Sequence, residues 1–247
     1  MVDNRLPVDA AILVVAKAPV AGQVKTRLAP PLSLVEAAHL AAAALLDTLG
    51  AVACAPVRHR VVALTGDLAA AELAEDVAAA LAGFDVVEQR GATFAARLAH
   101  AHADTAQRTG VPVLQIGMDT PQLDAELLTR SAETLAGPGV DAVLGPAADG
   151  GWWALGLCAA DVAAGLTTVR MSTADTGAAT LAMLRDRGQR TRLLPELVDV
   201  DHPADALYVA GSTGSASRFG RAVDALTDKL APPQPAQRPD STGSVRP

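Results

Sequence analysis

The chain has few aromatic residues and only two cysteines. Its 247 residues include three Phe, two Trp and one Tyr, so the core must be built mainly from aliphatic side chains. Cys54 and Cys158 have neither the density of a disulfide framework nor the spacing of metal ligands. This pattern favours a reducing compartment, and we expect a cytoplasmic protein.

Other absences exclude whole classes of partner. No apolar stretch approaches the roughly 20 residues that a membrane span needs. Residues 1–9 carry charges in place of the basic and apolar regions of a signal peptide. The formal net charge of −7 argues against a nucleic-acid polymer as partner. We therefore expect neither a membrane nor a nucleic acid as partner, and any polyanion site must be a local basic pocket that suits a small phosphorylated ligand.

The sequence also lacks the motifs of covalent catalysis and of common nucleotide loops. It contains no Gly-x-Ser-x-Gly elbow, no Walker loop and no Gly-x-Gly-x-x-Gly. His39, His100 and His102 fall within predicted helices, and none has a partner at metal-ligand spacing. Nothing in the sequence indicates a covalent nucleophile.

What the chain does contain is an alternation of short apolar strands with longer helical segments. Strands are predicted at 11–16, 60–65, 84–88, 111–117, 140–144, 152–157, 191–194 and 197–200, and helices at 34–49, 67–82, 94–108, 124–135, 176–187, from residue 203 and at 217–230. This alternation predicts a three-layer α/β fold with a mostly parallel sheet. We expect one domain over residues 10–230 and a disordered tail at 231–247, which is rich in Pro, Gln, Ser and Gly.

The first predicted strand leads into a loop that carries three cations. Lys17, Lys25 and Arg27 fall within eleven residues of a segment punctuated by proline and glycine. Open α/β sheets bind anionic ligands at the carboxyl ends of their strands, and backbone amides and cationic side chains can neutralise phosphates there. The alternative is a solvated surface loop. The residues expected at a nucleotide's phosphates are Lys17, Gly22, Lys25, Thr26 and Arg27.

Aspartates follow two later segments. Asp119 comes directly after the strand at 111–117, where its carboxylate could hold Mg²⁺ or Mn²⁺ against phosphate oxygens. Asp199 and Asp201 share a face if their segment is extended, and either could complete the metal site. The alternatives are ordinary ones: Asp119 as an N-cap or turn residue, and Asp201 or His202 as the N-cap of the helix that begins at the following proline.

A third unusual stretch is Asp149-Gly150-Gly151, followed by Trp152 and Trp153. Two glycines after an aspartate permit positive φ and expose backbone amides. Adjacent residues of a strand point to opposite faces, so one tryptophan can line a pocket while the other packs in the core. The alternative is a hairpin turn with a core tryptophan.

These segments together resemble the DUF2064 family, whose members are labelled glycosyltransferase-like or rSAM/selenodomain-associated transferase 1. The resemblance rests on residues 17–28, 116–121, 145–152 and 199–203, in that order, and covers roughly residues 10–210. It implies the GT-A, or nucleotide-diphospho-sugar transferase, fold. It would put the three loop cations on phosphates, Asp119 on the metal with Asp199 or Asp201 as a second acid, and the acceptor or sugar against residues 149–152.

We therefore expect a metal-dependent transferase that uses a nucleotide, with Lys25, Arg27 and Asp119 as its catalytic residues. The cation-rich loop favours a nucleoside triphosphate, and Asp119 is not part of an Asp-x-Asp motif. Both features favour nucleotidyl transfer to a small phosphorylated or hydroxyl acceptor. The family labels favour the first alternative, glycosyl transfer from a nucleotide sugar. The second alternative is a protein that binds a nucleotide without catalysis.

Overall fold

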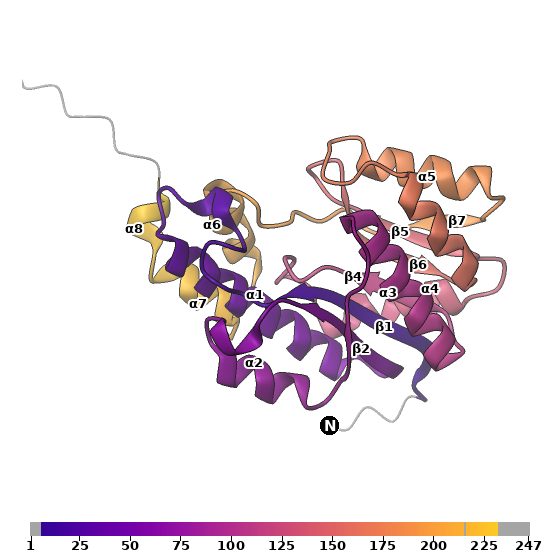
Figure 1. The fold of residues 1–247 in the computed structure, drawn as a ribbon, viewed down its shortest axis with the longest axis horizontal. Coiled ribbons are helices and arrows are strands. Elements are labelled where there is room, and N and C mark those ends of the chain that lie inside the picture. Colours follow the sequence, from indigo (N-terminus) through magenta and orange to yellow (C-terminus); the bar gives the residue numbers. More distant parts are fainter. Residues whose placement is uncertain (1–5, 215, 232–247) are drawn as a thin grey trace, which may run out of the picture.

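A computed structural model describes residues 6–214 and 216–231 as a seven-stranded sheet with helices on both faces (Figure 1). The strands are β1 (Val8–Lys17), β2 (Val57–Thr65), β3 (Asp85–Glu88), β4 (Val113–Ile116), β5 (Ala142–Pro146), β6 (Trp152–Leu157) and β7 (Thr191–Leu193). The α-helices are α1 (Leu34–Cys54), α2 (Ala74–Leu81), α3 (Phe94–Thr109), α4 (Ala125–Ala136), α5 (Thr176–Asp186), α6 (Pro203–Ser212), α7 (Arg218–Asp224) and α8 (Thr227–Leu230). Short 3₁₀ helices are η1 (Thr26–Leu28), η2 (Leu68–Ala70) and η3 (Ala160–Thr168).

The direction of the strands brings distant segments to one edge of the sheet. The strand order is β3-β2-β1-β4-β6-β5-β7, and β6 alone runs antiparallel to its two neighbours, β4 and β5. The remaining neighbours pair in parallel. The carboxyl ends of β1, β4 and β5 therefore lie at the same edge as the amino end of β6. This arrangement confirms the predicted three-layer α/β fold with a mostly parallel mixed sheet.

Successive apolar side chains of β1 point to opposite faces of the sheet, and helices cover both faces. Ile12 and Val14 pack into one apolar cluster with α1, α2 and α4. Leu13 and Val15 pack into another with α3, η3 and α5. Each fully buried side chain of this size contributes about 1.5–3 kcal/mol to stability. A strand buried on both faces reads as a continuous apolar run, as residues 10–16 do.

Helix α1 corrects one expectation from the sequence. It has 21 residues and is long and apolar enough to cross a membrane, so the statement that no apolar stretch approaches that length is wrong. In the structure, 67% of its most apolar window is buried inside the protein. One side of the helix, including Leu45 and Leu49, packs toward the sheet, and another, including Leu40, packs toward α6, α7 and α8. A helix covered on two sides is apolar nearly all round because it is a core helix.

The two ends of α1 differ in how well they were predicted. The helix begins at Leu34, as predicted, and Ser33 and Glu36 form a capping box at its start. Gly50 does not end it: the helix continues to Cys54, and the backbone N–H of Ala55 still bonds to the carbonyls of Ala51 and Val52. An interior glycine costs about 1 kcal/mol, which burial of Val52 offsets.

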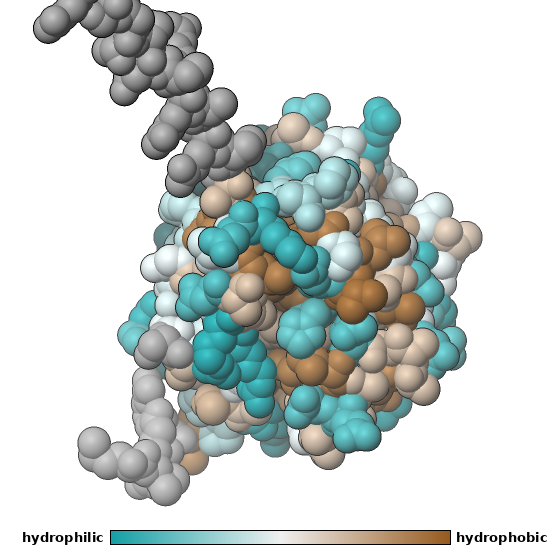
Figure 2. All heavy atoms as spheres, turned by 90° about the vertical axis from the view of Figure 1, so that its left-hand side faces the viewer, coloured by the Kyte–Doolittle hydropathy of each residue, from teal (hydrophilic) through white to brown (hydrophobic). Residues whose placement is uncertain are grey.

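The carboxyl-terminal helices pack on the outer side of α1. Asp47 of α1 accepts hydrogen bonds from the Ser217 hydroxyl and from the backbone N–H groups of Arg218 and Phe219, which fixes the start of α7. Phe219 is buried in the cluster beneath. Figure 2 views this side of the molecule and shows hydrophilic residues spread over it with hydrophobic areas between them. Residues 232–247 of the predicted tail lie outside the described residues, and the single-domain assignment for 10–230 stays a prediction.

Local predictions differ from the structure at several places, and the helix predicted at 67–82 is divided into η2 and α2. The segment predicted as a strand at 197–200 makes only one isolated bridge, between Ala147 and Leu197. The helix predicted at 217–230 is divided into α7 and α8. The 3₁₀ helix η3 was not predicted, because its short turns carry no helical period of apolar residues.

Candidate functional site

A cleft of about 830 Å³ opens at the edge where β1, β4 and β5 end and β6 begins. Parallel strands deliver their following loops to this edge, which is where open α/β sheets bind ligands. Most of the predicted site residues line the cleft, while Gly22 and Gly150 do not. The predicted residues that line it are Lys17, Lys25, Thr26, Arg27, Asp119, Asp149, Gly151, Trp152, Asp199 and Asp201.

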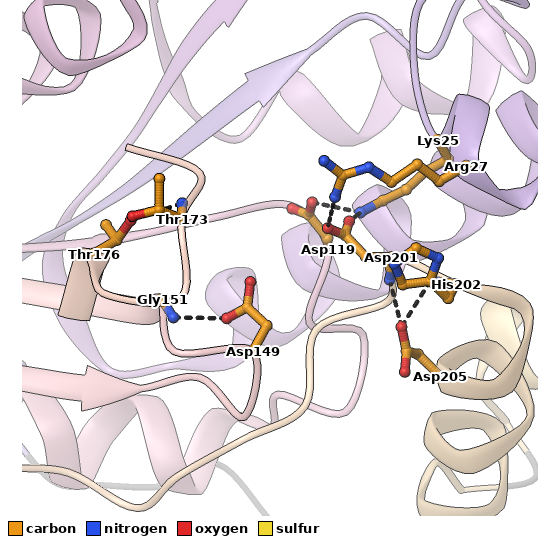
Figure 3. Close-up of polar contacts among 10 residues, drawn as sticks. All are labelled: Lys25, Arg27, Asp119, Asp149, Gly151, Thr173, Thr176, Asp201, His202 and Asp205. Atoms are coloured by element: carbon orange, nitrogen blue, oxygen red, sulfur yellow. Dashed lines mark hydrogen bonds and ion pairs between the residues drawn. The ribbon is translucent and has the colours of Figure 1, made fainter. Parts of the chain in front are cut away.

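A cluster of opposite charges joins the first loop to two distant aspartates (Figure 3). The Lys25 ammonium lies 2.7 Å from Asp119 Oδ2 and 2.8 Å from Asp201 Oδ1. Arg27 Nη1 donates to Asp201 Oδ2 at 3.0 Å. Lys25 is nearly buried, with 11% of its side chain exposed, whereas 63% of the Arg27 side chain is exposed. Lys25 therefore carries most of the electrostatic contact between the loop and the acids.

Opposite charges dominate the ionisation of this cluster. Burial alone would lower the pKa of Lys25, but the carboxylates of Asp119 and Asp201 raise the pKa well above its ordinary value. Burial alone would raise the pKa of Asp201, but Lys25 and Arg27 hold it below its ordinary value. Both partners are therefore charged near neutral pH.

The backbone of Lys25 is in a rare conformation. Its φ of +46° places a non-glycine residue in the left-handed region, just before η1. Such residues cost of order 1 kcal/mol and cluster at functional sites. The two ion pairs of the side chain stabilise this strained position. Thr26, the next residue, opens η1 and lines the cleft.

Asp201 also belongs to a group of three carboxylates. One oxygen each of Asp149, Asp199 and Asp201 lies within 4.8 Å of the others, a set that could hold a metal ion. Burial and the charges of Asp149, Asp201 and Asp119 raise the pKa of Asp199 to about 6. The crowding of negative charge is relieved by a proton on Asp199 or by a bound cation.

This arrangement gives two of the predicted residues different neighbours from those expected. Asp149, expected at the acceptor, lies in the group of three carboxylates. Asp119, expected as the first metal ligand, bonds through Oδ2 to Lys25 while remaining close enough to raise the pKa of Asp199. Asp124, not Asp119, is the N-cap of α4. The backbone carbonyl of Asp119 accepts a hydrogen bond from Val200 N–H, which holds the two aspartate segments together.

The first turn of helix α6 holds the backbone of Asp201 in place. The Asp205 carboxylate in its first turn accepts hydrogen bonds from the backbone N–H groups of Asp201 at 3.1 Å and His202 at 2.7 Å. Asp205 therefore caps the start of α6 as an acid of its first turn. The Asp201 side chain is left free to face Lys25 and Arg27, so it does not cap the helix itself.

The Asp149-Gly150-Gly151 turn is held by close backbone contacts. Asp149 Oδ1 accepts a hydrogen bond from Gly151 N–H at 2.7 Å. Gly150 has φ +87°, and a Cβ there would lie 2.0 Å from the Ala174 carbonyl oxygen. Its own carbonyl accepts a hydrogen bond from Gly177 N–H at the start of α5. Glycine is required at position 150 by both the conformation and the contact.

The two tryptophans point to opposite faces of the sheet, as predicted. Trp153 is buried among the residues facing α1 and α4, and its indole N–H donates to the Pro195 carbonyl at 2.9 Å. Trp152 is half-buried on the face of α3 and α5 and lines the cleft. Its indole nitrogen is buried and has no hydrogen-bond partner among the described residues.

Lys17 and Gly22 complete the first loop. Lys17 Nζ donates to the Gln23 carbonyl at 3.0 Å, and within the described ranges no carboxylate forms an ion pair with it. Gly22 is exposed with φ +76°, and it shapes the turn without lining the cleft. Their expected phosphate contacts stay predictions.

Several residues that line the cleft were not predicted from the sequence. Arg97 of α3, Gln115 of β4 and the segment 171–174 before α5 line it. Gln115 had a detectable signal, because it is a polar residue inside an otherwise apolar buried strand. Ser172, with φ +59°, had none.

The fold is an α/β fold of the GT-A-like, nucleotide-diphospho-sugar transferase type. The chain belongs to the DUF2064 family, described as "Uncharacterized protein conserved in bacteria", whose model matches residues 48–173. This confirms the resemblance inferred from the four motifs. No curated protein matches the sequence.

Solved structures agree on the fold. A "putative nucleotide-diphospho-sugar transferase" from Desulfovibrio desulfuricans G20 is 26% identical with a TM-score of 0.77, over 90% of this chain and 96% of that one. A cytidylyltransferase from Leptospira borgpetersenii serovar Hardjo-bovis is 12% identical with a TM-score of 0.53, over 90% and 94%. Rv0371C from Mycobacterium tuberculosis H37Rv, in complex with manganese, is 21% identical with a TM-score of 0.50, over 81% and 97%.

Proposed function

We propose that this protein is a metal-dependent transferase that uses a nucleotide, and that it transfers a nucleotidyl group to a small acceptor. The observation that carries this proposal is the meeting of a basic loop with carboxylates from three separate segments in one cleft. Phosphoryl and nucleotidyl transfer need little covalent chemistry from a protein beyond positioning and charge stabilisation.

The acidic side of the cleft fits a divalent cation. Asp149, Asp199 and Asp201 offer oxygen ligands, which Mg²⁺ and Mn²⁺ prefer, and Asp119 lies beside them. The manganese in the complex of the Mycobacterium tuberculosis relative is consistent with such a site. A cation bound here would neutralise phosphate oxygens and favour an attack at phosphorus.

The ion pairs of Lys25 and Arg27 suggest how the loop and the acids work together. Without a ligand, these two cations neutralise Asp119 and Asp201. A divalent cation on the acids would take over that role and leave Lys25 and Arg27 available to nucleotide phosphates, with Lys17, Gly22 and Thr26 in the same loop. The acceptor would lie near Asp149–Trp152, on the other side of the acids.

Nucleotidyl transfer forms a bond between an acceptor oxygen and the α-phosphorus, and pyrophosphate leaves. Glycosyl transfer forms a bond between the acceptor oxygen and the anomeric carbon, and a nucleoside diphosphate leaves. The description of the similar Desulfovibrio protein as a nucleotide-diphospho-sugar transferase favours glycosyl transfer as the second candidate. The three cations of the loop suit the larger charge of a triphosphate and favour the first.

A thermal-shift panel tests the proposal. Nucleoside triphosphates and nucleoside diphosphate sugars are each added with Mg²⁺, with Mn²⁺ and with EDTA. A ligand at a hundred times its dissociation constant stabilises by about 2.7 kcal/mol, which raises the melting temperature of a chain of this size by roughly 5–11 °C. A metal-dependent shift with one triphosphate supports nucleotidyl transfer. A shift with a nucleotide sugar alone supports the second candidate, and no shift with either class contradicts both.

A further inference from the structure

The cleft has a second polar region that the charged cluster does not use. It lies on the face of the sheet covered by α3, where Leu13 of β1 and Gln115 of β4 are paired neighbours. Gln115 is fully buried yet lines the cleft, and Arg97 of α3 and Trp152 of β6 line it as well. We refer to Arg97, Gln115 and Trp152 as the α3-side pocket.

Polar atoms of the α3-side pocket lack partners. Arg97 Nε, both amide atoms of Gln115 and Trp152 Nε1 are buried and form no hydrogen bond among the described residues. A buried polar group without a hydrogen-bond partner destabilises the folded state. Several such groups beside one cleft are candidates for hydrogen bonds to a bound molecule.

Behind the pocket, His102 gives Gln115 only weak support. Burial lowers the pKa of His102 to about 4, and the neighbouring Gln115 amide offsets this only in part. Neither ring nitrogen of His102 forms a hydrogen bond of ordinary geometry with the described residues. The contact with Gln115 raises the pKa of the ring, so the amide oxygen of Gln115 faces His102 and the amide N–H₂ group is left for the cleft.

Charge distinguishes this pocket from the loop cluster. Lys25 and Arg27 are paired with carboxylates. Arg97 is half-buried and forms no ion pair within the described ranges; its guanidinium carbon lies 5.8 Å from the centre of the Phe94 ring. A partly desolvated cation without a carboxylate partner favours an anion from outside the chain.

We propose that Arg97, Gln115 and Trp152 bind an oxyanion group, a carboxylate or a phosphate, carried by the second substrate. This inference rests on the proposed function and names the chemical class of its acceptor. The pocket offers N–H donors from three side chains, which matches an oxyanion. A neutral polyol would leave the charge of Arg97 uncompensated. A nucleobase would present donors as well as acceptors, which the donor-rich pocket meets poorly.

The two tryptophans allow a direct test by NMR of the indole N–H signals. The chain contains only Trp152 and Trp153, so the spectrum has two such signals, and Trp152→Phe assigns them. The Trp153 N–H, already bonded to Pro195, is an internal reference. The probes are inorganic phosphate, lactate, glycerol and a set of nucleosides, each titrated into the full-length protein. The variants are Arg97→Gln and, as a matched control, Arg108→Gln, an exposed arginine on the same helix that does not line the cleft.

We expect phosphate or lactate to shift the Trp152 signal in a saturable manner while the Trp153 signal stays in place. Whichever of the two binds more tightly identifies the oxyanion. Arg97→Gln should weaken binding at least tenfold, and Arg108→Gln should leave it unchanged. Glycerol or a nucleoside shifting Trp152 as strongly as the anions overturns the proposal, as does an unchanged affinity in Arg97→Gln. Arg97→Lys, which retains the charge, keeps the test informative if Arg97→Gln is unstable.

The thermal-shift panel separates failure here from failure of the proposed function. A metal-dependent nucleotide shift together with an Arg97-independent Trp152 response would leave the nucleotide site standing and remove only this pocket's role. Loss of both responses would contradict both proposals.

Discussion

Replacing Lys25 with methionine tests the charge cluster most sharply, because the change keeps the length of the side chain and removes its charge. In wild type, Lys25 neutralises Asp119 and Asp201 at 2.7 and 2.8 Å. Removing one partner of a buried ion pair costs about 3–5 kcal/mol. The two carboxylates keep 37% and 30% exposure, so water compensates part of the loss. We expect Lys25→Met to lower the free energy of unfolding by about 2 kcal/mol in EDTA.

The same variant should bind a divalent cation more tightly than wild type when no nucleotide is present. The ammonium group and the cation compete for the same carboxylates, so its removal should strengthen Mn²⁺ binding at least tenfold, which is about 1.4 kcal/mol. Urea unfolding in EDTA and in Mn²⁺ measures both effects, and Mn²⁺ should restore the lost stability. The matched control is Lys229→Met, which breaks an exposed pair with Glu36 and should have a much smaller effect that Mn²⁺ does not change. A Lys25→Met protein that is as stable as wild type in EDTA, or that binds Mn²⁺ more weakly, would refute the reasoning.

Three further predictions concern acid stability and the glycine turn. The pKa of Asp199 is raised to about 6, so the folded state binds this proton more tightly than the unfolded state does. Without metal, the free energy of unfolding should therefore fall as pH rises from about 4 to 6. Asp199→Asn should remove this fall, as measured by urea unfolding at several pH values. The pKa of His102 is lowered to about 4, so the unfolded state binds this proton more tightly than the folded state does. The free energy of unfolding should therefore fall as pH drops from about 6.5 to 4, which is the opposite pH dependence to that of Asp199. His102→Leu should remove this loss. Gly150→Ala should destabilise the protein by about 2 kcal/mol more than Gly188→Ala. Both glycines have positive φ, but only a Cβ at position 150 would contact Ala174. Equal losses of stability in urea unfolding would show that this contact does not matter.

The fold could be predicted from the sequence because its signals are local. The apolar run Ala11–Ala16 indicates β1, and the capping box at Ser33 indicates the start of α1. Each signal lies within a few residues of sequence. Apolar character alone did not separate a strand from an extended loop at 197–200, where only one bridge forms. It also did not show that Gly50 lies inside α1, because the packing that holds the helix beyond it is tertiary.

The sequence located most residues that line the candidate cleft, but it did not show which residues pair with one another, and the roles of these residues stay predictions. Lys17, Lys25, Asp119 and Asp201 all line the predicted cleft. The ion pairs of Lys25 join residues 94 and 176 positions apart, and no local pattern encodes which carboxylate faces which cation. The same holds for Asp149, which the turn beside α5 carries to the other acids.

The central claim is that a divalent cation links the acids of this cleft to a nucleotide's phosphates. The most direct measurement is titration of Mn²⁺ followed by electron paramagnetic resonance of the free ion, with and without the triphosphate chosen by the thermal-shift panel, in wild type and in Asp201→Asn. The account predicts that the nucleotide strengthens binding of one Mn²⁺ at least tenfold over its affinity for the nucleotide alone, and that Asp201→Asn abolishes this gain. Mn²⁺ binding that the nucleotide does not strengthen, or that Asp201→Asn leaves unchanged, would contradict it.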